Sequence, residues 1–212
     1  MAGRKKKDKD KSEPQSVLYY FYTQERWDNW ILTLKEMDFE GDPESEEMPE
    51  GLASLDNFTK DINVSVLKII KLVQNGSYNQ EMALAKLNEV EEIIMADLPE
   101  DELMDILGGV QMRFLVLFMS CKNFIMGEIG EGEIKDLVKQ GRAISDEDPE
   151  AALRIAADIG AKVLDGGSCC GKYLRGDFEN PTMFDDWLIE VDDISEALKS
   201  LKNFDEQFGE GN

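Results

Sequence analysis

The chain has 212 residues, of which 45 are acidic, 23 are basic and none is histidine, so its net charge is −22. A protein this acidic is repelled by phosphate backbones and by anionic membranes, and its natural partners are basic proteins or cations. The absence of histidine excludes serine and cysteine triads, HExxH zinc sites and di-iron bundles built on Glu-x-x-His pairs.

Composition also predicts the fold class. Hydrophobic residues make up 42% of the chain and only six prolines are present, so we expect an all-α fold and not disorder. Residues 4–11 (RKKKDKDK) carry a net charge of +4, which leaves −26 for the remainder. We expect a disordered basic tail over residues 1–14, a helical domain over 15–205 and a second tail over 206–212. The charged residues near the start do not fit a signal peptide, which predicts a cytoplasmic protein.

The first helix is predicted to follow an aromatic segment. Val17–Tyr22 is either a short strand or an apolar lead-in, and we favour the lead-in because no partner strand follows. Thr23 is a candidate N-cap, and apolar residues then recur at helical spacing until shortly before Gly41. Glu40–Gly51 (EGDPESEEMPEG) is an acidic linker that lacks the pattern of an EF-hand loop, so no calcium site is expected there.

Two more helices are predicted before the most apolar segment of the chain. Ser54 should cap the second helix, whose apolar stripe ends at Asn75–Gly76, a pair typical of a left-handed C-terminal cap. Ser77 and Gln80 form a capping-box pattern for the third helix.

Leu103–Met126 (LMDILGGVQMRFLVLFMSCKNFIM) is the most apolar stretch and is predicted to be a central, buried helix. Its middle, Phe114–Met119, is apolar on every side, which is typical of a helix buried all round. A membrane span needs about 20 nearly uncharged residues, whereas Arg113 and Lys122 leave eight uninterrupted residues between them. We therefore favour a core helix. Its start should be marked by Asp97, Pro99 and Glu100.

Three further helices are predicted after the glycines that follow. They cover roughly Glu133–Ile144, the segment from Asp148–Pro149 to Leu164, and the segment after Asn180–Pro181. In the last of them apolar residues recur at alternating spacings of three and four, a packing seam formed by Phe184, Trp187, Val191, Ile194, Leu198 and Leu201. The seam indicates one helix of a bundle, which we favour, or an interface with another chain. The sequence thus predicts a single-domain bundle of six or seven amphipathic helices around a buried central helix.

The stretch with the most unusual chemistry is Asp165–Gly176 (DGGSCCGKYLRG). It matches a P-loop up to Lys172, but a tyrosine replaces the magnesium-binding Ser or Thr and a helix precedes it, so nucleotide binding is not expected. Cys169 and Cys170 lie near Lys172 and Arg175, whose charges favour the thiolate. The loop is therefore a structural turn, a redox or metal-responsive thiol pair, or a turn that binds a small anion. Paired C-x-x-C spacing is missing, and we expect neither a bound metal nor a cofactor.

Carboxylates also gather on the last helix. Asp185, Asp186, Asp192 and Asp193 avoid the apolar seam, which predicts a solvated face and not a general acid–base pair. Together with Trp187 they are our candidate interaction surface, and no catalytic residue is expected.

Three segments carry a resemblance to one protein family: YYFYTQERWDNW (Tyr19–Trp30), SCCGKYLRG (Ser168–Gly176) and FDDWLIEVDDI (Phe184–Ile194). This combination resembles an uncharacterised family of archaeal proteins, found mainly in methanogens, over nearly the whole chain after the lysine-rich tail. The resemblance implies an archaeal cytoplasm. It implies no activity and supplies no catalytic residues.

The function that we expect is non-enzymatic: an adaptor or regulatory subunit that offers an acidic helical surface to a basic protein partner. A narrower form of this hypothesis is mimicry of nucleic acid by the carboxylates. One alternative is a thiol-based redox or metal-responsive sensor acting through Cys169 and Cys170. Another is association with nucleic acid through the lysine-rich tail. The acidic surface could also serve only to keep the protein dispersed in a salty cytoplasm.

Overall fold

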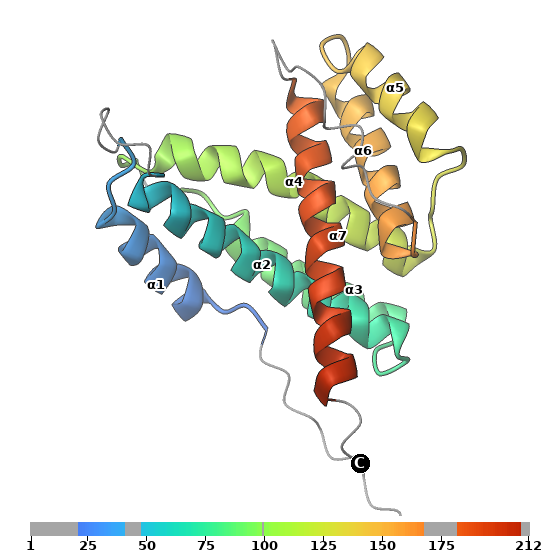
Figure 1. Ribbon diagram of the computed structural model, residues 1–212, viewed down its shortest axis with the longest axis horizontal. Helices are drawn as coiled ribbons and strands as arrows, with labels where there is room; N and C mark the ends of the chain where they lie inside the picture. Colours follow the sequence, from blue (N-terminus) through green and yellow to red (C-terminus); the bar gives the residue numbers. More distant parts are fainter. Residues whose placement is uncertain (1–20, 41–47, 99, 168–181, 209–212) are drawn as a thin grey trace, which may run out of the picture.

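The computed structural model describes residues 21–40, 48–98, 100–167 and 182–208. Within these ranges the chain forms seven helices and no strand, which confirms the predicted all-α bundle (Figure 1). The helices are α1 (Gln24–Lys35), α2 (Glu50–Gln74), α3 (Gln80–Ile94), α4 (Met104–Met126), α5 (Ile134–Ile144), α6 (Pro149–Leu164) and α7 (Met183–Phe208).

Local signals set several helix ends where they were predicted. Thr23 Oγ1 accepts a hydrogen bond from the Arg26 N–H at 3.2 Å and begins α1. Asp148 Oδ1 accepts one from the Ala151 N–H at 2.9 Å, ahead of a proline in the first turn of α6. After α2 the chain turns through Gly76, whose φ of +75° is a conformation that glycine adopts without strain.

The predicted start of α2 at Ser54 is wrong. The N-cap is Pro49, five residues before Ser54, and the first turn of the helix contains Gly51, so the acidic linker ends sooner than predicted. Gly51 is buried, and its N–H donates to the carbonyl oxygen of Asp38 at 2.8 Å. A Cβ at this position would lie only 2.7 Å from that oxygen, so the glycine allows the close approach that starts the helix.

The starts of α3 and α4 also differ from the prediction. Asn79, and not Ser77, caps α3, because its Oδ1 accepts from the Met82 N–H at 2.8 Å. α4 begins at Met104, after a turn in which the Met104 N–H donates to the carbonyl oxygen of Asp101 at 3.1 Å. Asp97 and Glu100 precede this turn and lie outside the helix, and Pro99 lies outside the described residues.

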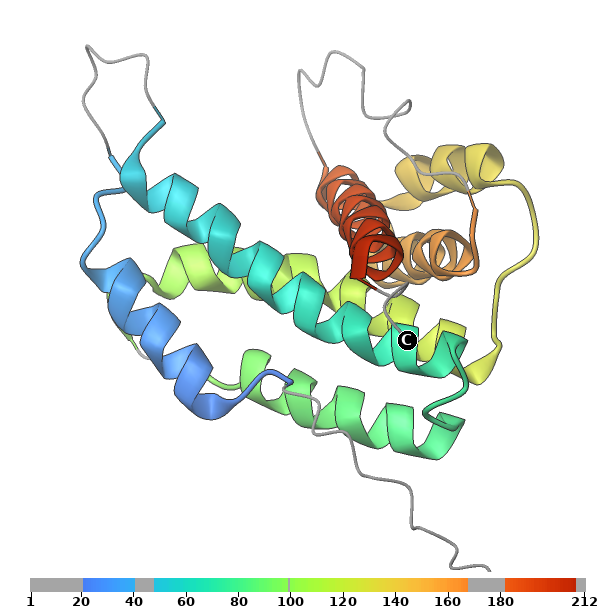
Figure 2. The same cartoon turned by 60° about the horizontal axis from the view of Figure 1, so that its bottom comes forward.

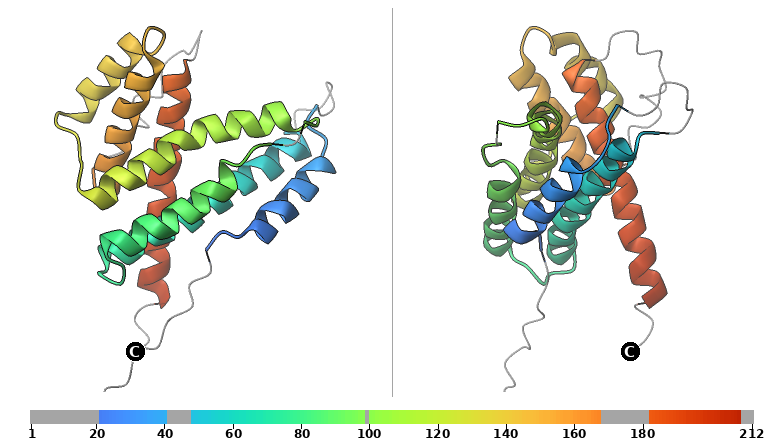
Figure 3. Two further views of the ribbon diagram at one scale, coloured as in Figure 1. Left: turned by 180° about the vertical axis from the view of Figure 1, so that it is seen from behind. Right: turned by 90° about the vertical axis from the view of Figure 1, so that its left-hand side faces the viewer.

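Two apolar cores share α4 and α7. The first core is enclosed by α1, α2, α3, α4 and the C-terminal part of α7, and the second by α5, α6 and the N-terminal part of α7, with Val116 of α4. Figure 2 shows α1 to α4 on one side and α5 to α7 on the other. In the left view of Figure 3, α7 runs across α4, with which it is in contact. α7 is therefore as central to the bundle as α4.

The prediction that α4 is a buried core helix is confirmed. It contacts α2, α3, α6 and α7, and Phe114 and Phe118 in its middle are almost completely buried. By length and mean hydropathy (1.4) the helix would also pass as a membrane span, as the core helix of a globular bundle often does. Its contact with α6 is close, because a Cβ at Gly160 would lie 2.0 Å from Ser120 Oγ.

The apolar seam of α7 packs inside the chain. Five of its residues are buried in the two cores, namely Phe184, Trp187, Val191, Ile194 and Leu198. This confirms the interpretation of α7 as one helix of a bundle.

Candidate functional site

The predicted thiol loop lies outside the described residues. Four candidate site residues fall within positions 168–181: Cys169, Cys170, Lys172 and Arg175. The third cysteine, Cys121, is fully buried on α4, and burial raises the pKa of its thiol well above the usual range. A thiol kept protonated in a core is a poor nucleophile. In the part of the chain that the structure describes, no group of three His, Cys, Asp or Glu residues could hold a metal ion.

Two members of the predicted interaction surface do not lie on the surface. Trp187 is only 2% exposed, and its indole N–H donates to the Met112 carbonyl oxygen at 2.9 Å, which ties α7 to α4. Asp185 is 6% exposed and accepts a hydrogen bond from Arg142 Nε at 2.8 Å. It also accepts from the N–H and the hydroxyl of Thr182, just before α7. The prediction of a solvated face is therefore wrong for Asp185, and Trp187, which lies in the predicted seam, is too buried to belong to an interaction surface.

The remaining three carboxylates of that surface separate into different environments. Asp186 is exposed on α7, whereas Asp192 and Asp193 are half-buried. Asp193 forms an ion pair with Arg113 of α4 at 2.5 Å between Oδ2 and Nη2. The predicted solvated face therefore fits Asp186, whereas Asp193 is half-buried against Arg113, a partner that the sequence did not predict.

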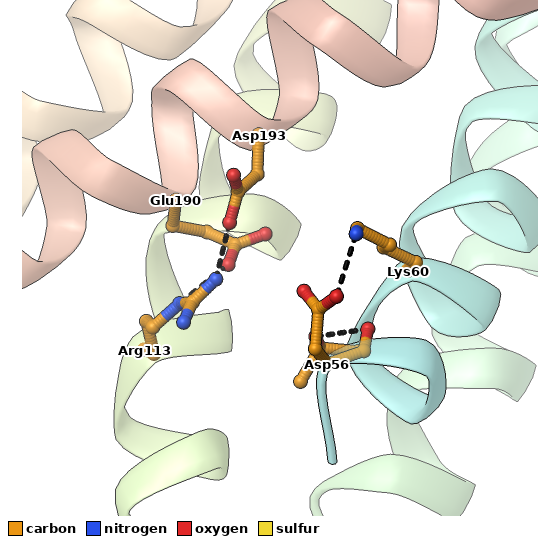
Figure 4. A network of polar contacts seen from close by, with 6 residues as sticks. Asp56, Lys60, Arg113, Glu190 and Asp193 are labelled. Carbon is orange, nitrogen blue, oxygen red and sulfur yellow. Dashed lines mark hydrogen bonds and ion pairs between the residues drawn. The ribbon is translucent and has the colours of Figure 1, made fainter. Parts of the chain in front are cut away.

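Arg113 bridges two acidic residues of α7 (Figure 4). Its Nε donates to Glu190 Oε2 at 2.8 Å, while its Nη2 donates to Asp193. The Glu190 side chain is 0% exposed and the Arg113 side chain 29% exposed. Such a pair tolerates the loss of one partner poorly, because the remaining charge stays away from water.

Burial dominates the titration of Glu190. It raises the pKa of the carboxyl group, and the positive charge of Arg113 and a hydrogen bond from Asn63 oppose this effect only in part. The Asn63 side chain lies on α2 and is 2% exposed. The three side chains therefore join α2, α4 and α7 at one buried polar point.

An acidic groove opens beside this point, between α2 and α7. It has a volume of about 190 Å³ and is lined by Lys60, Asn63, Val64, Asp193, Glu196, Ala197 and Ser200. Lys60 Nζ is held by Asp56 Oδ2 at 2.6 Å, one turn back on α2 (Figure 4). This contact, followed by attraction to Asp56, Asp193 and Glu196, raises the pKa of Lys60. We use the name acidic groove for these lining residues together with Asp56 and Asp192, whose charges act on Asp193.

Two neighbouring buried acceptors beneath the groove are left without a partner. Asn63 Oδ1 and Glu190 Oε1 accept no hydrogen bond from any described residue. Buried polar atoms are rarely left unpaired, so such an atom calls for an explanation.

A larger depression, of about 570 Å³, lies between the end of α1 and the start of α4. Its lining includes Lys35 and Asp101, whose side chains form an ion pair at 2.7 Å. The hydrogen bond from Lys35 is the main cause that lowers the pKa of Asp101. Because these charges pair with each other, we place the candidate site at the acidic groove.

Arg113, Glu190 and Asn63 were not predicted as members of a site. A signal for Glu190 was present, because it follows Trp187 by three residues and precedes Ile194 by four, which places it beside the buried seam. Asn63 gave no comparable signal, since a polar residue among the apolar residues of α2 does not reveal what it faces.

The architecture defines the class: an acidic, all-α bundle in which a polar groove lies over a buried Arg–Glu pair. The chain belongs to a family of uncharacterized proteins conserved in archaea (DUF2150), whose model matches residues 20–207. This confirms the archaeal family to which the sequence showed a resemblance. Neither a curated protein nor a solved structure matches the chain.

Proposed function

We propose that this protein is a non-enzymatic interaction protein, an adaptor or regulatory subunit, that binds a basic protein partner through the acidic groove. The observation that carries the proposal is the excess of negative charge around the groove. The pKa of Asp193 is raised, first by burial and then by repulsion from Asp192, Glu196 and Asp56, despite the opposing charge of Arg113. Carboxylates that repel one another in this way gain from a cationic partner, which also speeds encounter.

A charge-neutralised variant tests the proposal. We expect Asp56→Asn/Asp192→Asn/Glu196→Gln to lose partner binding about fivefold to tenfold, because exposed ion pairs are individually weak but act together. The tagged protein is purified from an archaeal host of this family, and the proteins that co-purify are quantified by mass spectrometry. A basic protein should be depleted with the variant and released from the wild type by salt.

The matched control removes the same charge elsewhere. Glu92, Glu131 and Glu147 are exposed and do not line the groove, so Glu92→Gln/Glu131→Gln/Glu147→Gln should retain the partner. Equal losses with both variants would mean that net charge alone governs binding, and would contradict the groove as the binding surface.

Replacing both vicinal cysteines separates this proposal from a thiol-based sensor. We expect Cys169→Ser/Cys170→Ser to co-purify the same partner in the same amount, with and without mild oxidant, because the proposed binding depends on carboxylates and not on a thiolate. Loss of the partner in the cysteine variant, or its release by oxidant from the wild type alone, would favour a sensor that works through these thiols.

A further inference from the structure

The turn between α2 and α3 carries a pair of residues that can react with each other. Asn75 and Gly76 are both exposed to water, and no other asparagine in the sequence is followed by glycine. In such a pair the backbone nitrogen of the glycine can attack the side-chain amide carbon of the asparagine, because glycine has no side chain that hinders the approach. The sequence therefore places the chain's most reactive asparagine at this turn.

The folded turn holds the two reacting groups apart. With a ψ of 3°, the Asn75 backbone points the Gly76 nitrogen away from the Asn75 side chain, so ring closure needs a large rotation about the Cα–C bond. The Gly76 N–H also donates to the Val73 carbonyl oxygen at 3.0 Å. Asn75 Oδ1 accepts from the Ser77 N–H at 3.0 Å, which fixes the side chain. A reaction at Asn75 therefore requires the turn to open.

Contacts beyond the pair keep the turn closed. The Tyr78 N–H donates to the Leu72 carbonyl oxygen at 2.9 Å, which ties the chain after the turn to the last turn of α2. The Tyr78 ring is half-buried and lies against Phe21, with 6.2 Å between the ring centroids. Local opening of a turn costs less than global unfolding, and its cost depends on contacts of this kind. The Tyr78 ring is therefore the anchor of the turn.

We propose that Asn75–Gly76 is a site of spontaneous deamidation, and that opening of the turn anchored by Tyr78 sets its rate. In the open turn the Gly76 nitrogen loses its proton and forms a bond to Cγ of Asn75. The bond from Cγ to the amide nitrogen breaks, and that nitrogen leaves as ammonia. Water then opens the cyclic imide at either of its two carbonyl groups, which gives aspartate or isoaspartate. No electrons are transferred, and water is the only co-reactant.

Both products loosen the end of α2. An aspartate at this position adds a negative charge at the C-terminal end of the helix, where the helix dipole is already negative. An isoaspartate lengthens the backbone by one methylene group, which displaces the N–H groups of Gly76 and Tyr78 from the carbonyl oxygens that they bond. The reaction therefore converts a brief opening into a lasting change of the turn.

Peptide mapping over time tests the proposal. The full chain is kept in mildly alkaline buffer, either folded or in guanidinium chloride, and samples are digested and analysed by mass spectrometry. We expect Asn75 of the folded protein to convert to both products, about tenfold more slowly than in denaturant. Asn88, which is exposed on α3 and precedes a glutamate, should stay unmodified in the folded protein. Tyr78→Ala should raise the folded rate about threefold and leave the rate in denaturant unchanged.

Matched variants separate the anchor from the reacting pair. Tyr78→Phe keeps the ring and should convert more slowly than Tyr78→Ala, and Phe21→Leu weakens the same contact from the other side if Tyr78→Ala folds poorly. Asn75→Gln should remove the modification, because a longer side chain closes the ring poorly. An intact Asn75 in the folded protein, after the denatured chain has converted, would overturn the site. Equal rates in buffer and in denaturant, or wild-type rates in both anchor variants, would overturn its control by the turn.

Discussion

Replacing Arg113 by methionine is expected to destabilise the fold by about 3 kcal/mol near neutral pH, the lower end of the range for breaking a buried ion pair. Methionine keeps most of the apolar stem but leaves Glu190, which is 0% exposed, without its counter-charge. Asp193 loses the same partner at 2.5 Å. We take the lower end because 29% of the Arg113 side chain is exposed to water. The free energy of unfolding from urea titration measures the effect.

The stability lost in Arg113→Met should depend on pH. Burial already raises the pKa of Glu190, and Arg113 is the first influence that lowers it, so the variant should raise that pKa further. The folded variant then holds a proton that the unfolded chain has released, between the ordinary carboxyl pKa and the raised one. When the folded state binds more protons than the unfolded state, the protein loses stability as the pH rises through that window. The variant should therefore lie closer to the wild type at about pH 5 than at about pH 8.

Two further variants isolate the charge. Arg154→Met breaks an exposed pair with Glu150, at 2.6 Å within α6, and should change stability little. Arg113→Met/Glu190→Gln removes both charges of the buried pair and should recover much of the loss, together with the pH dependence. A double variant as unstable as Arg113→Met at every pH would show that the stem of Arg113, and not its charge, supports the fold.

The sequence predicted the elements whose signals are local and missed those decided by distant contacts. α6 begins where predicted because Asp148 and the proline after it act within one helical turn. The start of α2 was missed because glycine disfavours helix, and Gly51 is tolerated there only through its contact with the chain at Asp38. The all-round apolar middle of α4 and the periodic seam of α7 were enough to predict that both are buried.

The candidate site likewise combines residues that the sequence makes visible with contacts that only the fold creates. Arg113 was visible as a charge within an apolar helix, but its partner Glu190 lies 77 residues further along the chain. Without an alignment that links the two positions, only the fold brings them together. The burial of Asp185 was missed for a similar reason, because its partner Arg142 lies on α5, 43 residues earlier in the chain. A pattern of carboxylates on one helix could not reveal either contact.

Gly141→Ala is expected to destabilise the fold by about 1–3 kcal/mol, the usual range for inserting a group into a filled core. This change in stability is opposite in sign to the usual one, because replacing glycine by alanine inside a helix ordinarily stabilises by roughly 1 kcal/mol. Gly141 is buried on α5, and a Cβ there would lie 2.0 Å from two ring carbons of Phe184. Phe184 is 0% exposed in the second core, so its ring has little room to move.

A matched substitution on α4 should have the opposite effect. Gly109 is exposed within the helix, and a Cβ there would meet no atom within 4 Å, so Gly109→Ala should stabilise by about 0.5–1 kcal/mol. Phe184→Leu removes the ring atoms that face Gly141, and Gly141→Ala/Phe184→Leu should be less unstable than the sum of the two single variants. Urea titration of the wild type and of these four variants measures each change in the free energy of unfolding. If Gly141→Ala were as stable as Gly109→Ala, the contact of α5 with α7 would be loose enough for the second core to accept a larger residue at this position.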